Sequence, residues 1–527
     1  MLDIVIKNGI LVDGTGTAPY EAELGIADGR IVLVEKEITQ EAAKTIDAAG
    51  LHVAPGFIDP HTHSELALLA NPKAESKVRQ GVTTEIVGNC GGSPGPLLGA
   101  AMEEEIAHAR VFGVEVDWTT LGGYLERIAR QGCALNVASL VGHNTIRSSV
   151  LGFDDVQPTP VQQVEMEQLV VEAMQQGACG LSTGLFYPPG YFAHTQEVIG
   201  LAKVVAEHGG IYASHIRSET DHLFEAVEEA IDIGAGAGIK VQISHIKLEG
   251  YRNWDGIEHL VGLLEGAVSK SVSLRCDQYP YVAGASWLAY ILPYWAQAGG
   301  AQEVAHRLRD REVRHRLRAD WEANRSQWEE RGGMRDWSDL LITSCHTRPE
   351  VQGKTVSDIA LADGKDPFDT SLDLIVVSEG QVECVCFGQL ESNVRRLMKH
   401  PLVGVGSDGE SLAPYGTLGQ CGTHPRSYGT FPRVLGRYVR DEKVLSVEEA
   451  VKKMTFDTAR QFNLADRGVI ALGVWADLAI FNAQTVTDLA TYTSPHTYPE
   501  GVPFVIVNGV TVIDQGEHSG ALPGKVL

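Results

Sequence analysis

Short apolar runs of strand length recur through the middle of the chain, and helical patterns lie between many of them. The runs cover residues 52–58, 84–88, 134–141, 180–183, 211–214, 241–244, 273–276 and 402–406. Mostly apolar runs of this length are typical of buried strands. Two of the helical patterns cover residues 160–176 and 223–233. This alternation predicts an α/β fold in which about eight parallel strands with helical crossovers form a (β/α)8, TIM-like barrel.

The two ends of the chain have a different pattern, with short alternating segments between turn residues. Near the N-terminus the segments are residues 3–6, 23–26 and 30–35, and near the C-terminus they are residues 469–472, 478–481, 504–507 and 510–513. Turn dipeptides such as Asn8-Gly9 and Asn508-Gly509 favour hairpins. We therefore expect residues 1–54 and 464–527 to meet as one small β-sandwich domain beside a barrel of residues 55–463.

One segment of the barrel, about residues 284–345, is longer than a helical crossover requires. It holds five tryptophans and an Arg- and Glu-rich helical pattern from Val304 to Arg331. Long connections of this kind are often functional. We interpret the segment as a lid-like insertion, while most of its charged positions are also compatible with an ordinary solvated helix surface.

Composition and charge narrow the range of partners. The chain has 527 residues and a formal net charge of -25. Such a surface repels phosphate groups, so we expect neither a nucleic acid partner nor binding to an anionic membrane. No apolar run reaches the ~18 residues that span a bilayer, and the N-terminal residues lack the pattern of an export signal. The eight cysteines form no CxxC pair and are typical of reduced thiols in a cytoplasmic protein.

Two histidines follow the first apolar run, with a single residue between them. Along an extended chain residues i and i+2 point to the same side, so His61 and His63 would direct two imidazoles to one point. Neutral imidazole is a common ligand of zinc and related metals. Taken alone, this pair is equally compatible with a loop that carries two solvated histidines.

Further potential metal ligands follow other strands. Cys90 comes after the second run, His215 and His245 end the fifth and sixth, and Asp408 follows the last. Each has an ordinary interpretation as a structural histidine, a buried thiol or a turn residue. In a barrel, however, the carboxyl ends of all strands meet at one face, which is where active sites lie. Together the ligands predict a metal site, and His, thiolate and carboxylate ligands favour zinc.

This ligand set predicts hydrolytic chemistry. Zinc lowers the pKa of a bound water to about 7 and polarises a carbonyl oxygen. Asp408 would accept the proton of that water and pass it to a leaving amine. Gly180-Leu181-Ser182-Thr183-Gly184 matches the G-x-S-x-G string of serine hydrolases. A nucleophile elbow needs a strand-to-helix turn, and a proline-rich loop follows here, so serine hydrolysis is disfavoured.

The motifs around these residues resemble those of the D-aminoacylase (N-acyl-D-amino-acid deacylase) family of the amidohydrolase superfamily. The resemblance covers nearly the whole chain. It is carried by Gly56-Phe57-Ile58-Asp59-Pro60-His61-Thr62-His63, Gly88-Asn89-Cys90-Gly91, Ser182-Thr183-Gly184-Leu185-Phe186-Tyr187-Pro188-Pro189-Gly190, Ser214-His215-Ile216-Arg217-Ser218-Glu219, Ser244-His245-Ile246-Lys247, Gly406-Ser407-Asp408-Gly409 and His424-Pro425-Arg426-Ser427-Tyr428-Gly429-Thr430-Phe431-Pro432-Arg433.

The resemblance implies a barrel with a small β domain and a role for each motif residue. One zinc would be bound tightly by Cys90, His215 and His245. His61 and His63 would offer a second, weaker position, and the number of metals remains open. The family's catalytic carboxylate falls on Asp408. Contacts to the substrate carboxylate would fall on Tyr187, Lys247, Tyr279 and Arg426, although Lys247 and Arg426 could each also be surface charges.

The activity that the resemblance implies is zinc-dependent hydrolysis of N-acyl-D-amino acids to a carboxylate and a free D-amino acid. The preference for the D form comes from the resemblance alone. A cyclic-amide hydrolase of the hydantoinase or dihydroorotase kind is the alternative, and Cys90 in place of a bridging lysine argues against it. A binding protein that kept the barrel without catalysis would have no use for Asp408. The side-chain preference and the oligomeric state stay open.

Overall fold

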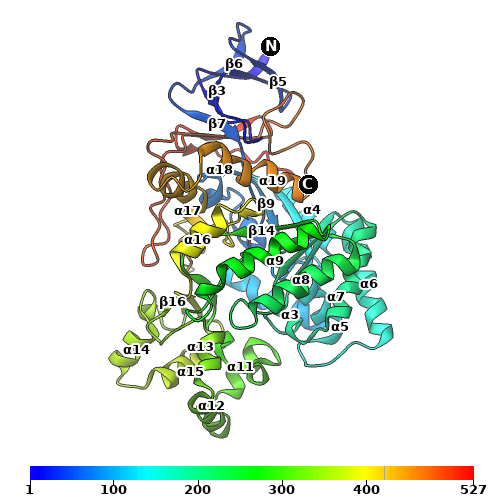
Figure 1. Ribbon diagram of the computed structural model, residues 1–527, viewed down its shortest axis with the longest axis vertical. Coiled ribbons are helices and arrows are strands. Elements are labelled where there is room, and N and C mark those ends of the chain that lie inside the picture. The colour runs from blue at the N-terminus through cyan, green and yellow to red at the C-terminus, as the bar shows by residue number, and fades with distance from the viewer. Residues whose placement is uncertain (421) are drawn as a thin grey trace.

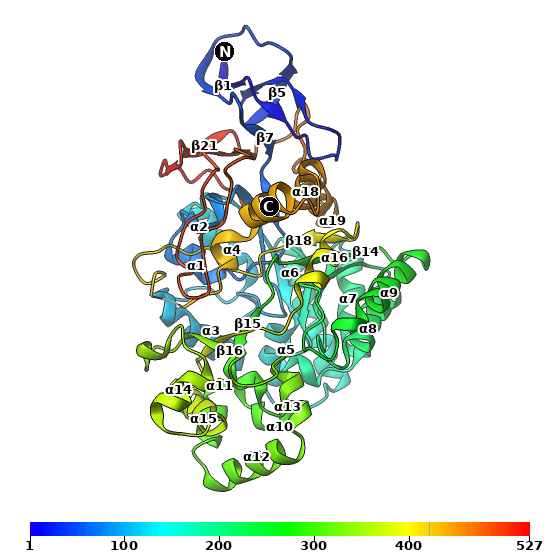
Figure 2. The same ribbon diagram turned by 60° about the vertical axis from the view of Figure 1, so that its left-hand side comes forward.

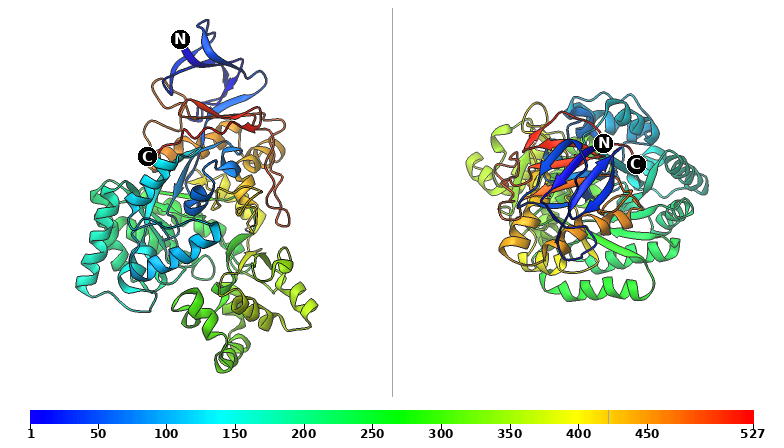
Figure 3. Two further views of the ribbon diagram at one scale, coloured as in Figure 1. Left: turned by 180° about the vertical axis from the view of Figure 1, so that it is seen from behind. Right: turned by 90° about the horizontal axis from the view of Figure 1, so that it is seen from above.

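The computed structural model describes residues 1–420 and 422–527. Three parts follow one another along its long axis (Figure 1). The sheets built from the two chain ends lie at one end, the barrel lies in the middle, and a helical segment from the middle of the chain lies at the other end. The view from behind shows the same order, and in the view from above the sheets of the two chain ends lie in front of the other parts (Figure 3).

Eight parallel strands form the central sheet, so the predicted TIM-like barrel is confirmed. Their order is β18-β14-β13-β12-β11-β10-β9-β8. Their bounds are β8 (Phe57–Asp59), β9 (Val82–Val87), β10 (Asn136–Gly142), β11 (Ala178–Gly184), β12 (Ile211–His215), β13 (Lys240–Ile243), β14 (Leu274–Gln278) and β18 (Val403–Val405). Nearly every residue of these strands is buried, as expected for strands covered on both faces.

Loop contacts close the barrel between β8 and β18. Thr62 and Gly409 form an isolated parallel bridge beyond the ends of these strands. Asp408 N donates to His61 O at 2.8 Å, and His63 N donates to Gly409 O at 3.0 Å. The closure of the barrel therefore holds the His61–His63 loop directly against the Asp408 loop.

Helices cover the outside of the barrel, and the two predicted helical patterns are both found. The covering helices include α5 (His143–Leu151), α6 (Pro160–Gln175), α7 (Thr195–Glu207), α8 (Leu223–Ala237), α9 (Ile257–Ser269), α16 (Glu391–Met398) and α18 (Val447–Met454). α3 (Gly99–Phe112) and α4 (Leu121–Gln131) follow β9. Apolar faces of these helices and the strands form one large core, and Figure 2 shows the helices against the barrel.

Both chain ends contribute to the β sheets above the barrel. One sheet has the order β5-β4-β1-β6, and the other has the order β22-β21-β20-β19-β7-β2-β3. The bounds are β1 (Leu2–Lys7), β2 (Ile10–Leu11), β3 (Tyr20–Glu21), β4 (Glu23–Ala27), β5 (Arg30–Glu35), β6 (Ala42–Asp47), β19 (Leu478–Phe481), β20 (Phe504–Val507), β21 (Val510–Asp514) and β22 (Glu517–His518). Residues 469–472, predicted as a strand, are irregular, although Ile470 packs into the core of these sheets.

The apolar run at residues 52–58, which we predicted as one strand, is two strands in different sheets. β7 (His52–Pro55) pairs with β19 and β2, whereas β8 pairs with β9. The break lies at Gly56, where an added Cβ would be 2.1 Å from Thr83 Oγ1. The chain passes so close to β9 here that only glycine fits, and this contact redirects the run from one sheet into the other.

The segment between β14 and β18 has its own sheet and core. The strands β15 (Gly284–Trp287), β16 (Leu340–Ser344) and β17 (Glu383–Cys386) pair antiparallel in the order β15-β17-β16. The helices are α10 (Tyr294–Gln297), α11 (Gly300–Arg307), α12 (Arg311–Ala323), α13 (Arg325–Arg331), α14 (Val356–Asp363) and α15 (Pro367–Val377). Trp321, Trp328 and Phe368 pack at its centre. The sheet continues to Cys386, past residue 345 where we expected the insertion to end.

We refer to residues 284–387 as the insertion. Its role as a lid and the limits of the domains stay predictions.

Among the described residues, no helix is both long enough and apolar enough to cross a membrane.

Candidate metal centre

Five loops or strand ends of the barrel bring the predicted ligands together. His61 and His63 follow β8, Cys90 follows β9, His215 is the last residue of β12, and His245 follows β13. Asp408 follows β18. His61, Cys90, His245 and Asp408 each offer a ligand atom, and these four atoms lie within 4.8 Å of one another. The predicted convergence at the carboxyl face of the barrel is therefore present in the structure.

Cys90 lies at the middle of the cluster. Its Sγ is 3.3 Å from His61 Nε2, 3.5 Å from His215 Nδ1 and 3.5 Å from His245 Nε2. The thiol is thus shared between a His215–His245 side and a His61 side. A thiolate in this position could serve two neighbouring metal positions.

Asp408 faces the His61 side of the cluster. Its Oδ1 lies 3.3 Å from His61 Nε2 and 3.0 Å from His63 Nε2. Its Oδ2 lies 2.6 Å from Arg426 Nη1. One side of the carboxylate therefore faces the candidate ligands and the other faces a buried cation.

Three of the cluster residues have left-handed backbone conformations. The φ angle is 51° at Cys90, 35° at His245 and 52° at Asp408. Non-glycine residues rarely adopt this region, and each such residue costs on the order of 1–3 kcal/mol. Strain of this kind concentrates at functional sites, where the surrounding structure holds the side chain in a required direction.

The charges in the cluster suit a cation. Burial alone would raise the pKa of the Cys90 thiol, but His61, His215 and His245 together hold it well below its ordinary value. Burial likewise opposes ionisation of Asp408, yet Arg426, His245 and His61 keep its pKa well below the usual range. His215 Nε2 and His61 Nδ1 are buried without a hydrogen bond among the described residues. Thiolate, imidazole and carboxylate at these distances fit a zinc ion.

Glu219 is a candidate functional residue that the sequence reasoning did not identify. Its Oε1 lies 2.8 Å from His245 Nδ1 and 2.5 Å from Lys247 Nζ, and its Oε2 lies 3.9 Å from His215 Nε2. A carboxylate on the second ring nitrogen of a ligating histidine fixes the tautomer and the ring orientation. The available signal was the repeated His-Ile-Arg/Lys pattern, which places Glu219 four residues after His215.

A second carboxylate lies beside His61, on the side away from Cys90. Asp277, directly after Cys276 on β14, has its Oδ1 3.4 Å from His61 Nδ1. The same oxygen accepts from His245 N at 2.8 Å, and Asp277 Oδ2 accepts from Gln242 Nε2 at 2.7 Å. Asp277 therefore links the two sides of the cluster from beneath.

A buried ion-pair network supports the closing loops. Lys77 Nζ lies 2.8 Å from Asp59 Oδ2 and 3.2 Å from Glu85 Oε1, and all three side chains are fully buried. Lys77 also donates to Ser407 Oγ at 2.6 Å, and Asp59 Oδ1 accepts from Ser407 N at 2.9 Å. The network thus ties Ser407, the neighbour of Asp408, to the carboxyl end of β8.

The four residues expected to contact the substrate carboxylate lie around the cluster. The ring of Tyr187 is 4.6 Å from that of His215. Lys247 Nζ and Arg426 Cζ lie 5.5 Å and 5.0 Å from the centre of the Tyr279 ring. Lys247 and Arg426 are both buried, so neither is a surface charge.

Lys247 and Arg426 differ in how many of their hydrogen-bond donors are already used. Lys247 Nζ already donates to Glu219 and, at 3.1 Å, to His245 O. Arg426 Nη1 makes the ion pair with Asp408 but has no partner with the geometry of a hydrogen bond among the described residues. Ser286, which we did not predict, also has a buried hydroxyl oxygen without a partner among the described residues. Arg426 Nη1 and the Ser286 hydroxyl are thus among the buried polar atoms that have no hydrogen-bond partner in the part of the chain that the structure describes.

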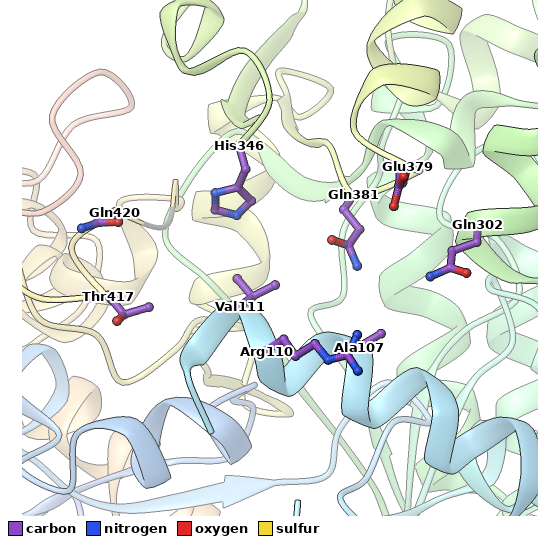
Figure 4. A pocket seen from close by; sticks show the side chains of 9 residues that line it. All are labelled: Ala107, Arg110, Val111, Gln302, His346, Glu379, Gln381, Thr417 and Gln420. Carbon is purple, nitrogen blue, oxygen red and sulfur yellow. The ribbon is translucent and has the colours of Figure 1, made fainter. Parts of the chain in front are cut away.

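A separate cleft of about 390 Å³ opens between α3, the insertion and the segment before residue 421. Figure 4 shows Arg110 on α3 opposite His346 and Gln381 of the insertion. None of the predicted site residues lines this cleft. It is thus distinct from the metal centre.

A parallel barrel with a buried Cys/His/Asp cluster at its carboxyl face defines the class of metal-dependent barrel hydrolases. Comparison with known proteins supports the same class. Residues 44–513 match the model of the amidohydrolase family, and the chain belongs to that family.

Two curated proteins of Alcaligenes xylosoxydans xylosoxydans are similar over the whole chain. N-acyl-D-glutamate deacylase is 34% identical, with 100% of this chain and 96% of that protein aligned. D-aminoacylase is 35% identical, with 100% and 97% aligned. These nearly equal identities do not rank one amino acid side chain above another.

A crystal structure gives the corresponding comparison of folds. It is N-acyl-D-glutamate deacylase from Bordetella bronchiseptica, complexed with zinc and a phosphonate inhibitor that mimics the tetrahedral intermediate. The TM-score is 0.84 at 33% identity, with 100% of this chain and 99% of that chain covered.

Proposed function

We propose that this protein is a zinc-dependent deacylase that hydrolyses the amide bond of N-acyl-D-amino acids. The products are a carboxylate and a free D-amino acid. The observation that carries the proposal is the combination of a buried Cys/His/Asp cluster with a buried arginine that has unused donors. The similar proteins support the substrate class, since they act on N-acyl-D-amino acids and one of them was solved with zinc.

We assign zinc binding to Cys90, His215 and His245. His61 and His63, with Cys90 and Asp408, would hold a second, weaker ion. A bound zinc ion supplies a water of lowered pKa and polarises the substrate carbonyl. Since ligands must be deprotonated, binding releases the protons that the clustered histidines hold in the metal-free protein.

Asp408 is the proposed general base and acid. It accepts a proton from the water that attacks the acyl carbon, and then delivers it to the leaving nitrogen. The carboxylate is suited to this role because Arg426 and the neighbouring histidines keep it ionised and directed at the cluster. The short distance between the Asp408 and His61 backbones fixes this orientation.

Arg426 is the proposed anchor of the substrate carboxylate. Its planar guanidinium can form two parallel hydrogen bonds with a carboxylate. Tyr187 and Tyr279 line the same space, and Lys247 contributes positive charge while it stays paired with Glu219. Binding at Arg426 places the amide of an N-acyl amino acid next to Asp408, because the two side chains are in contact.

The test measures hydrolysis of N-acetyl-D- and N-acetyl-L-amino acids by protein of known zinc content. We expect D-selective turnover that disappears on chelation and returns with zinc. Absence of turnover on every linear N-acyl amino acid, with zinc bound, would refute the proposal. A hydantoin in the same assay addresses the cyclic-amide alternative, for which we expect little or no turnover because Cys90 occupies the bridging position.

The remaining expectations concern partners and location. We propose small N-acyl amino acids as the substrates, with no nucleic acid partner. A cytoplasmic location stays a prediction that rests on the composition of the chain.

A further inference from the structure

Glu249 is a partly buried carboxylate in the loop after β13, two residues beyond Lys247. Backbone hydrogen bonds hold the loop, since Glu249 N donates to Glu219 O and Gly250 N donates to Gly388 O, both at 2.9 Å. The carboxylate itself has no hydrogen bond and no ion pair with any residue that the structure describes. The backbone of Glu249 is thus held in place, while its carboxylate lacks a hydrogen-bond partner among the described residues.

The carboxylate lies beside the residues proposed to surround the substrate. A Cβ built on Gly284 would be 3.2 Å from Tyr279 Oη and 3.4 Å from Glu249 Oε1. Gly284 and Ser286 are two residues apart on β15, so they share one face of that strand. The Glu249 carboxylate and the Tyr279 hydroxyl therefore both lie next to Gly284, on the strand that also carries the Ser286 hydroxyl.

The nearby cations are already paired. Lys247 is bound to Glu219, and Arg426 is paired with Asp408. Both cations lie near the ring of Tyr279, whereas Glu249 lies at its hydroxyl end. Arg426 thus lies against the ring of Tyr279, and the Glu249 carboxylate lies near its hydroxyl group.

The energetics of Glu249 favour a cationic ligand. Burial raises the pKa of Glu249 to about 7, and the nearby Lys247 opposes this shift only in part. A carboxylate that is withdrawn from water without a donor is unfavourable. A ligand ammonium or guanidinium would form a charge-assisted hydrogen bond with it.

We propose that Glu249 makes this enzyme selective for amino acids with a cationic side chain, so that N-acyl-D-lysine and N-acyl-D-arginine are the preferred substrates. The inference rests on the proposed function, which supplies the reaction and the D configuration. Such substrates carry an anionic and a cationic group several bonds apart, which suits Arg426 at the ring of Tyr279 and Glu249 near its hydroxyl group.

The experiment compares charged substrates with neutral ones of the same shape. N-α-acetyl-D-lysine is paired with N-acetyl-D-norleucine, N-α-acetyl-D-arginine with N-acetyl-D-citrulline, and N-acetyl-D-glutamate is included. In the zinc-loaded enzyme we expect kcat/KM for each cationic substrate to exceed that of its neutral partner by about 10-fold or more. In Glu249→Gln we expect that advantage, taken as the ratio of the two kcat/KM values in the same variant, to fall to about 2-fold or less.

Glu322→Gln is the matched control, because Glu322 is an exposed glutamate on α12. It should leave every ratio unchanged. Wild-type enzyme that hydrolyses norleucine or glutamate substrates faster than lysine substrates would overturn the inference and leave the proposed function standing. A preference for lysine that survives in Glu249→Gln would also overturn it. No turnover of any substrate by zinc-loaded enzyme would instead refute the proposed function itself. If Glu249→Gln does not fold, the order of the kcat/KM values of the wild-type enzyme for these substrates still tests the inference.

Discussion

Glu219 contacts both His245 and Lys247, so variants of Glu219 and Lys247 should affect the stability of the protein and its affinity for zinc differently. Glu219 accepts from both His245 Nδ1 and Lys247 Nζ, and the Glu219 and Lys247 side chains are only 10% and 7% exposed. Breaking a buried pair from one side leaves an uncompensated charge, which costs on the order of 3–5 kcal/mol. We therefore expect Glu219→Gln and Lys247→Met each to destabilise the zinc-free protein by about 3 kcal/mol, since glutamine retains some hydrogen bonding.

The double variant tests the origin of that cost. Glu219→Gln/Lys247→Met removes both charges, so its destabilisation should be smaller than the sum of the two single effects by about 2 kcal/mol. Zinc affinity should respond differently, because it depends on the His245–Glu219 contact. We expect it to fall about 10- to 100-fold in both variants that lack Glu219 and to stay near the wild-type value in Lys247→Met.

Urea unfolding of the zinc-free proteins and competition with a zinc-binding dye measure the two quantities. Strict additivity of the two destabilisations would show that the pair is not coupled and would refute the electrostatic reasoning. Equal losses of zinc affinity in Lys247→Met and Glu219→Gln would refute the assignment of Glu219 as the residue that orients His245.

Three further changes test other parts of the structure. Asp408→Asn should lower kcat by about 100-fold or more, since the proton transfer is lost, while the zinc content measured by atomic absorption stays high; full activity would exclude Asp408 as the base. Lys77→Met leaves Asp59 and Glu85 buried without their cation and should lower the free energy of unfolding by about 3–5 kcal/mol; a change below 1 kcal/mol in urea unfolding would contradict this. Burial lowers the pKa of Lys453 from 10.5 to about 8, so the unfolded chain binds more protons than the folded protein between these values and stability should rise with pH across that window. Lys453→Met should remove this part of the rise, and an identical pH dependence in the variant would refute the assignment.

Much of the metal centre was predictable from sequence because parallel strands give a simple rule. Once His61, Cys90, His215, His245 and Asp408 were placed at strand ends, the barrel topology required them to meet at one face. The rule needs no knowledge of side-chain packing. It therefore brings the candidate ligands together but says nothing of the carboxylates beside them, such as Glu219.

Other features depend on contacts that a local pattern does not contain. The run at residues 52–58 is apolar throughout, so nothing in its periodicity reveals that Gly56 lies against Thr83 and turns the chain into a second sheet. The sheet of the insertion extends beyond residue 345 because β17, its central strand, lies about 100 residues after β15. Strand pairing over such a separation is set by the tertiary fold.

The left-handed conformations of Cys90, His245 and Asp408 lower the stability of the fold in order to place side chains that the chemistry requires. Glycine would relieve the backbone cost at each position, but it would also delete the thiolate, imidazole or carboxylate. An inactive descendant of this chain could thus gain stability at the positions where an active one cannot. In relatives that have lost hydrolytic activity but keep the barrel, we expect glycine at these strand ends. Glycine at these three positions would therefore mark such relatives in a sequence comparison.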